Sequence, residues 1–127
     1  MRLACLALVV LPMLATPAVA RQESFSADYE ACRARSDGPM EADACLSEEL
    51  TRQEAAMEQA LQAAMRVAED AQKPILVESQ QAWLTYREKW CGAKGAVTGS
   101  GRSVYHLSCM VRTTMERRRA LAAFDEP

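Results

Sequence analysis

One helical face in the second half of this chain carries side chains that are able to do chemistry. Residues 74–91 contain no helix breaker after Pro74, and proline is tolerated in the first turn of a helix. The face combines a large aromatic ring with an amide, a guanidinium and a thiol, where a plain core helix would place aliphatic side chains. Its members recur at intervals of four, three, four and four residues: Leu76, Gln80, Trp83, Arg87 and Cys91. We therefore expect this face to find polar partners elsewhere in the chain.

Two charged residues on other predicted helices are expected to supply these partners. Glu54 interrupts the apolar stripe of residues 41–71, and Arg117 shares one face with the apolar residues of 104–124. In an antiparallel bundle both come to about the height of Trp83, at roughly 1.5 Å of rise per residue. A carboxylate at such a position could act as a catalytic acid, but one that is held by two guanidinium groups is a poor proton donor. We interpret the set as a structural polar cluster without a catalytic residue: Glu54, Gln80, Trp83, Arg87 and Arg117.

The elements that position these residues are all predicted to be helices. Residues 41–71 lack glycine and proline and are rich in good helix formers, and residues 27–35 could form a short helix before them. The sequence Ser-Asp-Gly-Pro at 36–39 indicates a turn between the two. Residues 92–103 hold four glycines and are predicted to be a loop. Short connections favour antiparallel neighbours, so we predict an all-α fold, an antiparallel three-helix bundle with a short N-terminal helix.

The first 20 residues have the pattern of a secretory signal peptide. Arg2 forms a short positive region, residues 3–15 are apolar, and Ala18, Val19 and Ala20 make a small-x-small cleavage site. The apolar run is too short to span a bilayer. The alternative is a buried first helix, which the polar sequence after the cleavage site disfavours. We therefore expect one helical domain at 21–127 that is periplasmic or secreted and has no membrane attachment after signal removal.

The cysteine count predicts two disulfides. Cys5 would leave with the signal peptide, and an even number of cysteines in a small exported chain is typical of a disulfide framework. The four that remain allow three pairings, of which we expect the sequence-local one: Cys32 with Cys45, and Cys91 with Cys109. A zinc site made from the four thiolates is the alternative. We expect no metal, because no C-x-x-C pair is present and the expected compartment is oxidising.

Charge is unevenly distributed along the chain. Residues 21–70 carry 12 acidic and 5 basic side chains, whereas residues 71–127 carry 5 acidic and 9 basic ones. A mildly acidic whole does not favour nucleic acid as a partner. The asymmetry indicates that the two halves face each other or that one face is offered to a basic partner.

Enzymatic chemistry finds little support in the sequence. The chain shows no Ser-His-Asp set, no metal cluster and no phosphate-binding loop, and His106 is its only histidine. There is also no C-x-x-C-H haem attachment. We therefore expect neither a cofactor nor catalytic activity.

The spacing of the polar face resembles the LprI-type lysozyme inhibitor family. The pattern L-x3-Q-x2-W-x2-Y-R-x3-C is present as Leu76, Gln80, Trp83, Tyr86, Arg87 and Cys91. A glycine-rich stretch follows, and then C-x4-T-x2-R-x3-L as Cys109, Thr114, Arg117 and Leu121. The first half is similar more loosely, through Cys45, Leu46, Glu54 and Met57. In this half Glu58 replaces the usual Asn and Leu61 the usual Tyr, and the resemblance spans about residues 29–124.

The resemblance implies a small exported helical domain that binds and blocks lysozyme. Many lysozymes are basic proteins with a pair of carboxylates in a cleft, so an acidic surface would speed the encounter. We expect the loop at 92–103 to contact the partner through Lys94, Ser100 and Arg102, a cation of which would pair with the carboxylates. The alternative is an interaction or assembly module of the cell envelope with a different protein partner.

Overall fold

All secondary structure in the described part of the chain is helical. The computed structural model describes residues 24–97, 99 and 101–126. Its elements are α1 (Ala27–Ala34), α2 (Pro39–Val67), α3 (Gln72–Gly95) and α4 (Arg102–Ala122). The expected signal peptide at 1–20 lies outside the described residues. Among the residues described, no helix is both long and apolar enough to cross a membrane.

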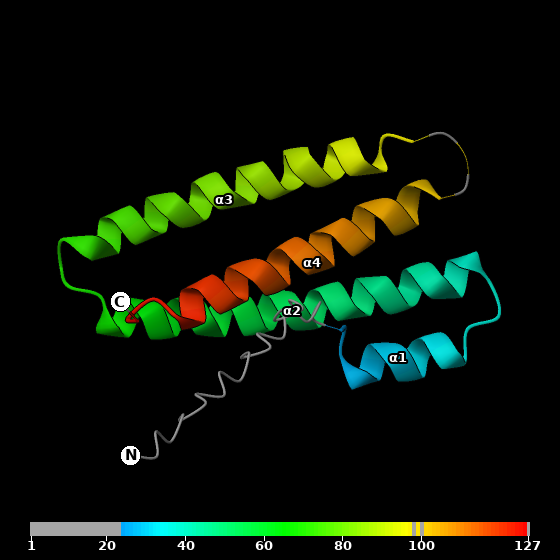
Figure 1. Ribbon diagram of the computed structural model, residues 1–127, viewed down its shortest axis with the longest axis horizontal. Helices are drawn as coiled ribbons and strands as arrows, with labels where there is room; N and C mark the ends of the chain where they lie inside the picture. The colour runs from blue at the N-terminus through cyan, green and yellow to red at the C-terminus, as the bar shows by residue number, and fades with distance from the viewer. Residues whose placement is uncertain (1–23, 98, 100, 127) are drawn as a thin grey trace, which may run out of the picture.

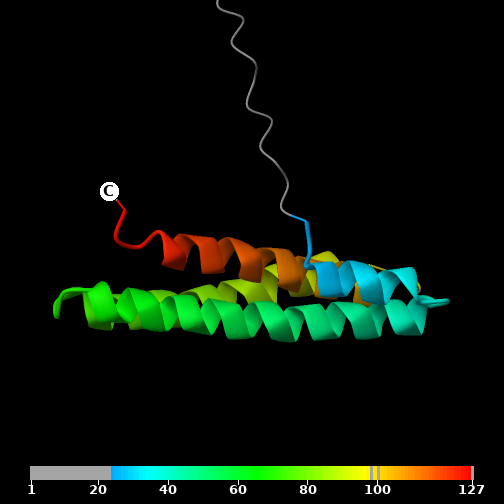
Figure 2. The same cartoon turned by 90° about the horizontal axis from the view of Figure 1, so that it is seen from below.

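The central helix of the fold is α4, which packs along both α2 and α3 (Figure 1). Consecutive helices run in opposite directions, so α2 and α4 are parallel to each other and α3 is antiparallel to both. The short α1 lies beside the first half of α2, as both views show (Figure 2). This arrangement confirms the predicted all-α bundle with a short N-terminal helix.

Two disulfides join the helices at one end of the molecule, which we call the bridged end. Cys32 of α1 pairs with Cys45 of α2, and Cys91 of α3 pairs with Cys109 of α4. The α1–α2 and α3–α4 connections lie at this same end (Figure 1). Both predicted pairings are confirmed. Each bridge contributes roughly 2–4 kcal/mol, which matters in a small domain with a limited apolar core.

The apolar core is built from all three long helices. One cluster of buried residues consists of Met57, Ala64, Leu76 and Leu121, and the partly buried Trp83 and Phe124 pack against it. This cluster lies toward the end opposite the disulfides, since Ala64 and Leu76 flank the α2–α3 connection. Leu46 and Val111 are buried nearer the disulfides, so apolar packing continues along the bundle.

The glycine-rich segment differs from its prediction. We expected a loop over residues 92–103, but α3 continues to Gly95 and α4 begins at Arg102, so the connection spans only 96–101. Glycine in a helix is unfavourable by about 0.5–1 kcal/mol, but packing compensates here. A Cβ atom built on Gly95 would lie 2.9 Å from the Cβ of His106. Gly95 thus allows the ends of α3 and α4 to approach closely beside their disulfide.

Candidate functional site

Arg87 is the centre of the polar cluster. Its Nη1 donates to Glu54 Oε1 over 2.8 Å and to Thr114 Oγ1 over 2.9 Å, so one guanidinium links α3 to both α2 and α4. The Arg87 side chain is only 7 % exposed. Its Cζ atom also lies 5.1 Å from the centroid of the Trp83 ring, within the range of a cation–π contact.

Arg117 approaches the same tryptophan from α4. Its Cζ atom lies 5.9 Å from the centroid of Trp83, while Nε donates to Gln80 Oε1 over 2.9 Å and Nη2 donates to Ser79 Oγ over 3.0 Å. Burial lowers the pKa of the Arg117 guanidinium below its ordinary value. Gln80 in turn donates through Nε2 to the sulfur of Met57 on α2 over 3.7 Å.

The structure therefore brings the five predicted cluster residues together, with one difference in their pairing. Arg117 donates its hydrogen bonds to Gln80 and Ser79. Glu54 is therefore paired with Arg87 and does not form the predicted contact with two arginines. The Glu54 side chain is 42 % exposed and reaches the solvent. Because the hydrogen bonds of Arg87 to Glu54 and Thr114, of Arg117 to Gln80 and of Gln80 to Met57 join different helices, we propose that the cluster fixes the relative positions of α2, α3 and α4.

A second buried carboxylate, Glu49, was missed by the sequence reasoning. It has no exposed surface and accepts hydrogen bonds from the backbone N–H of Ser26 (3.0 Å), the Ser26 hydroxyl, Gln53 Nε2 (2.9 Å) and Arg52 Nε (3.1 Å). Burial alone would raise the pKa of Glu49, but the hydrogen bonds from Ser26, Gln53 and Arg52 outweigh it and lower that pKa. Since Ser26 is the N-cap of α1, Glu49 anchors the start of α1 to α2.

Helical spacing could have identified Glu49. It lies four residues after Cys45, three after Leu46 and eight before Met57, on the buried face of α2. Leu50, the next residue, is half-buried, whereas Glu49 is fully enclosed. A carboxylate on the apolar face of a helix must be paired with hydrogen-bond donors if it is buried, so the position of Glu49 in the sequence indicated such donors.

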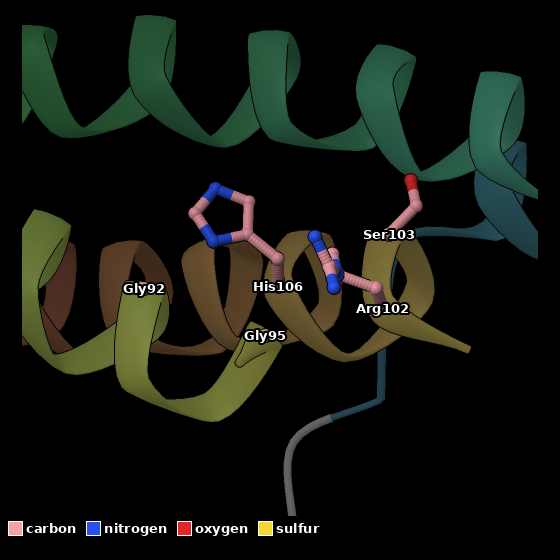
Figure 3. A pocket seen from close by; sticks show the side chains of 5 residues that line it. All are labelled: Gly92, Gly95, Arg102, Ser103 and His106. Atoms are coloured by element: carbon pink, nitrogen blue, oxygen red, sulfur yellow. The ribbon is translucent and has the colours of Figure 1, made fainter. Parts of the chain in front are cut away.

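The bridged end carries a pocket of about 470 Å³ between the end of α3 and the start of α4. Figure 3 shows its lining, in which Gly92 and Gly95 come from α3 and the side chains of Arg102, Ser103 and His106 come from the first turns of α4. None of these five residues is acidic. The N-cap of α4 is Gly101, which has no side chain to accept from the first N–H groups of the helix. The lining of this pocket thus favours a negatively charged group.

Two of the polar lining residues are held by backbone carbonyls. His106 Nδ1 lies 3.1 Å from the carbonyl oxygen of Cys91, so Nδ1 donates its proton there and Nε2 is left for another partner. Arg102 Nε donates to the carbonyl oxygen of Val97 over 3.3 Å, which leaves its terminal nitrogens for another partner. A carboxylate that enters the pocket could accept from the Arg102 fork.

The two predicted partner-binding residues that the structure describes do not line the same pocket. Arg102 lines the pocket, whereas Lys94 belongs to α3 and lies over the Trp90 ring, with Nζ 5.1 Å from its centroid. Lys94 lines a separate groove between α3 and α4. Ser100 lies outside the described residues. In the described part of the chain, no three His, Cys, Asp or Glu side chains are placed to hold a metal ion.

Comparison with known proteins identifies the family. The model of the family described as Lysozyme inhibitor LprI matches residues 32–121, which is well over half of the chain. The chain therefore belongs to this family, and the resemblance carried by the Trp83, Arg87 and Cys91 spacing is confirmed. No curated protein and no solved structure matched the chain.

Proposed function

We propose that this protein is an exported binding protein that blocks lysozyme and has no catalytic activity of its own. The match to the lysozyme inhibitor family over residues 32–121 carries the proposal. The fold is consistent with it, because two disulfides give a small helical domain the rigidity that lowers the entropic cost of binding. The signal-peptide pattern at residues 1–20 is the basis for proposing export to the periplasm or the exterior.

The bridged end is the surface that we propose contacts the enzyme. Lysozymes use a pair of carboxylates in a cleft, and the pocket beside His106 offers the Arg102 guanidinium as a donor, with no acidic residue in its lining. Arg102 would pair with one of these carboxylates. Lys94, which lines the neighbouring groove, and Ser100 are further candidate contacts. The acidic first half of the chain, with 12 acidic and 5 basic residues in 21–70, would steer a basic enzyme toward the molecule.

An inhibition assay with matched charge reversals tests this function. Purified protein comprising residues 21–127 is added to lysozymes of different classes, and the clearing of a cell-wall suspension is followed by turbidity. We expect inhibition by the wild type and at least about ten-fold weaker inhibition by Arg102→Glu, because the variant places an acid where a carboxylate should bind. Lys89→Glu, which reverses an exposed charge on α3, is the control and should inhibit like the wild type.

Two results would contradict the proposal in different ways. Absence of inhibition by the wild type at a large molar excess would refute the function, and a pull-down that captures a different envelope protein would then favour the alternative module. Inhibition that is equally strong in Arg102→Glu would retain the function but move the contact away from the pocket.

A further inference from the structure

The groove that contains Lys94 has the features of a second binding site. It lies between the last turns of α3 and the middle of α4 and encloses about 320 Å³. The pocket at the bridged end is lined by a different set of residues. The groove residues that carry the argument are Tyr86, Trp90 and Lys94 on α3, with Ser108, Arg112 and Glu116 on α4.

Two aromatic rings form the apolar part of this groove. The rings of Tyr86 and Trp90 are nearly parallel, with 10° between their planes and 6.3 Å between their centroids. Tyr86 is 52 % exposed and Trp90 is 46 % exposed, although large aromatic side chains contribute most when they are covered. Lys94 lies over the Trp90 ring, one helical turn further along α3. The rings are therefore held in place before any ligand arrives, which limits the entropy lost on binding.

The polar part of the groove offers both donors and acceptors. Arg112 supplies guanidinium N–H groups and Glu116 supplies a carboxylate, while Ser108 adds a hydroxyl that can do either. The Arg112 guanidinium is positioned from the other side by Phe25, whose ring centroid lies 4.8 Å from Cζ. Charges of both signs do not favour a strongly charged ligand. They suit a neutral ligand that is rich in hydroxyl groups.

We propose that this groove binds a saccharide chain. Sugar rings have C–H faces that pack on aromatic rings and hydroxyls at their edges that need donors and acceptors, which matches the two parts of the groove. The surface that Tyr86 and Trp90 leave exposed would contact the sugar rings, and Arg112 and Glu116 would hydrogen-bond their hydroxyl groups. The proposal is independent of lysozyme inhibition. If both hold, the groove keeps the inhibitor on the glycan strands that the enzyme attacks.

A calorimetric titration with a defined oligosaccharide tests this inference. The probe is a soluble hexamer of β-1,4-linked N-acetylglucosamine, added to the purified protein comprising residues 21–127. We expect saturable binding by the wild type, and at least about ten-fold weaker binding by Trp90→Ala and by Tyr86→Ala. The control is Ile75→Ala, which removes an exposed apolar side chain of α3 outside the groove and should leave the affinity unchanged. Circular dichroism melts establish that each variant is folded.

The outcomes separate a saccharide site from a protein-docking surface, since tryptophan, tyrosine and arginine are also enriched at protein interfaces. The inference is overturned if the wild type shows no binding at millimolar hexamer, or if Trp90→Ala binds as tightly as Ile75→Ala. A separate titration with lysozyme assigns the groove to protein docking if Trp90→Ala loses affinity for the enzyme while the wild type does not bind the hexamer. No lysozyme is present in the hexamer titration, so a failure of inhibition does not affect this result.

Discussion

Replacing Glu54 with alanine is expected to reduce the free energy of unfolding by about 2–3 kcal/mol. The cost arises at its partner, because Arg87 is 7 % exposed and would lose a carboxylate at 2.8 Å while staying desolvated. Removing one member of a fully buried ion pair costs roughly 3–5 kcal/mol. We expect less here because Glu54 itself is 42 % exposed and because Arg87 Nη2 also lies 3.8 Å from a carboxylate oxygen of Glu88.

Thermal and urea denaturation of Glu54→Ala measure this effect. For a domain of about 100 residues, 1 kcal/mol corresponds to roughly 4–5 °C, so the midpoint should fall by about 8–15 °C. Glu54→Gln keeps an acceptor for Arg87 without the charge and should lie between the wild type and Glu54→Ala. Adding Arg87→Met to Glu54→Ala removes the unpaired charge, so the double variant should be more stable than the sum of the two single losses predicts.

An unchanged melting midpoint in Glu54→Ala would show that the ion pair does not hold the helices together. Strict additivity in the double-mutant cycle would show that Glu54 and Arg87 act independently, in spite of their contact. Either result would refute the proposal that the cluster fixes the positions of α2, α3 and α4.

Two further predictions concern Glu49 and Gly95. The pKa of Glu49 is lowered in the folded protein, so its ionised form stabilises the fold above the ordinary glutamate pKa of about 4.3, and this contribution is lost as the pH falls through the lowered value. Urea denaturation at a series of pH values should therefore show that the free energy of unfolding falls less steeply at acid pH in Glu49→Gln than in the wild type. An identical pH dependence of the two proteins would contradict the stabilising role of ionised Glu49. Gly95→Ala should destabilise by about 1–3 kcal/mol, because its Cβ would meet that of His106 at 2.9 Å. Gly92→Ala is the matched control, since its Cβ meets nothing within 4 Å and alanine should stabilise the helix by about 0.5–1 kcal/mol.

The sequence was sufficient to predict the helices and most of the cluster. The face that carries Trp83 and Arg87 has a strict helical spacing, and helix rise alone placed Glu54 and Arg117 at the same height. The exact hydrogen bonds could not be predicted in this way, because helix rise gives the height of a residue along the bundle but not the partner that its side chain reaches. In the structure, Arg117 donates a hydrogen bond to Gln80 and not to Glu54.

Two further differences from the sequence reasoning have a common physical cause, which is that tertiary contacts override local preference. Four glycines favour a loop at 92–103, but the Cys91–Cys109 disulfide and the close approach at Gly95 keep the helix continuous. Glu49 looks like a solvated residue of an acidic run, but Ser26 from a distant segment supplies its donors. Both the approach of Gly95 to His106 and the hydrogen bonds of Ser26 to Glu49 join different segments of the chain.

Hydrogen–deuterium exchange of the protein with and without lysozyme tests the central claim most directly. The claim is that this rigid, disulfide-bonded bundle binds lysozyme through its bridged end and thereby blocks the cleft of the enzyme. It predicts that lysozyme slows exchange in peptides covering residues 92–106 and leaves the far end of the bundle, around residues 64–76, unchanged. Protection confined to other segments, or no protection at saturating lysozyme, would contradict it.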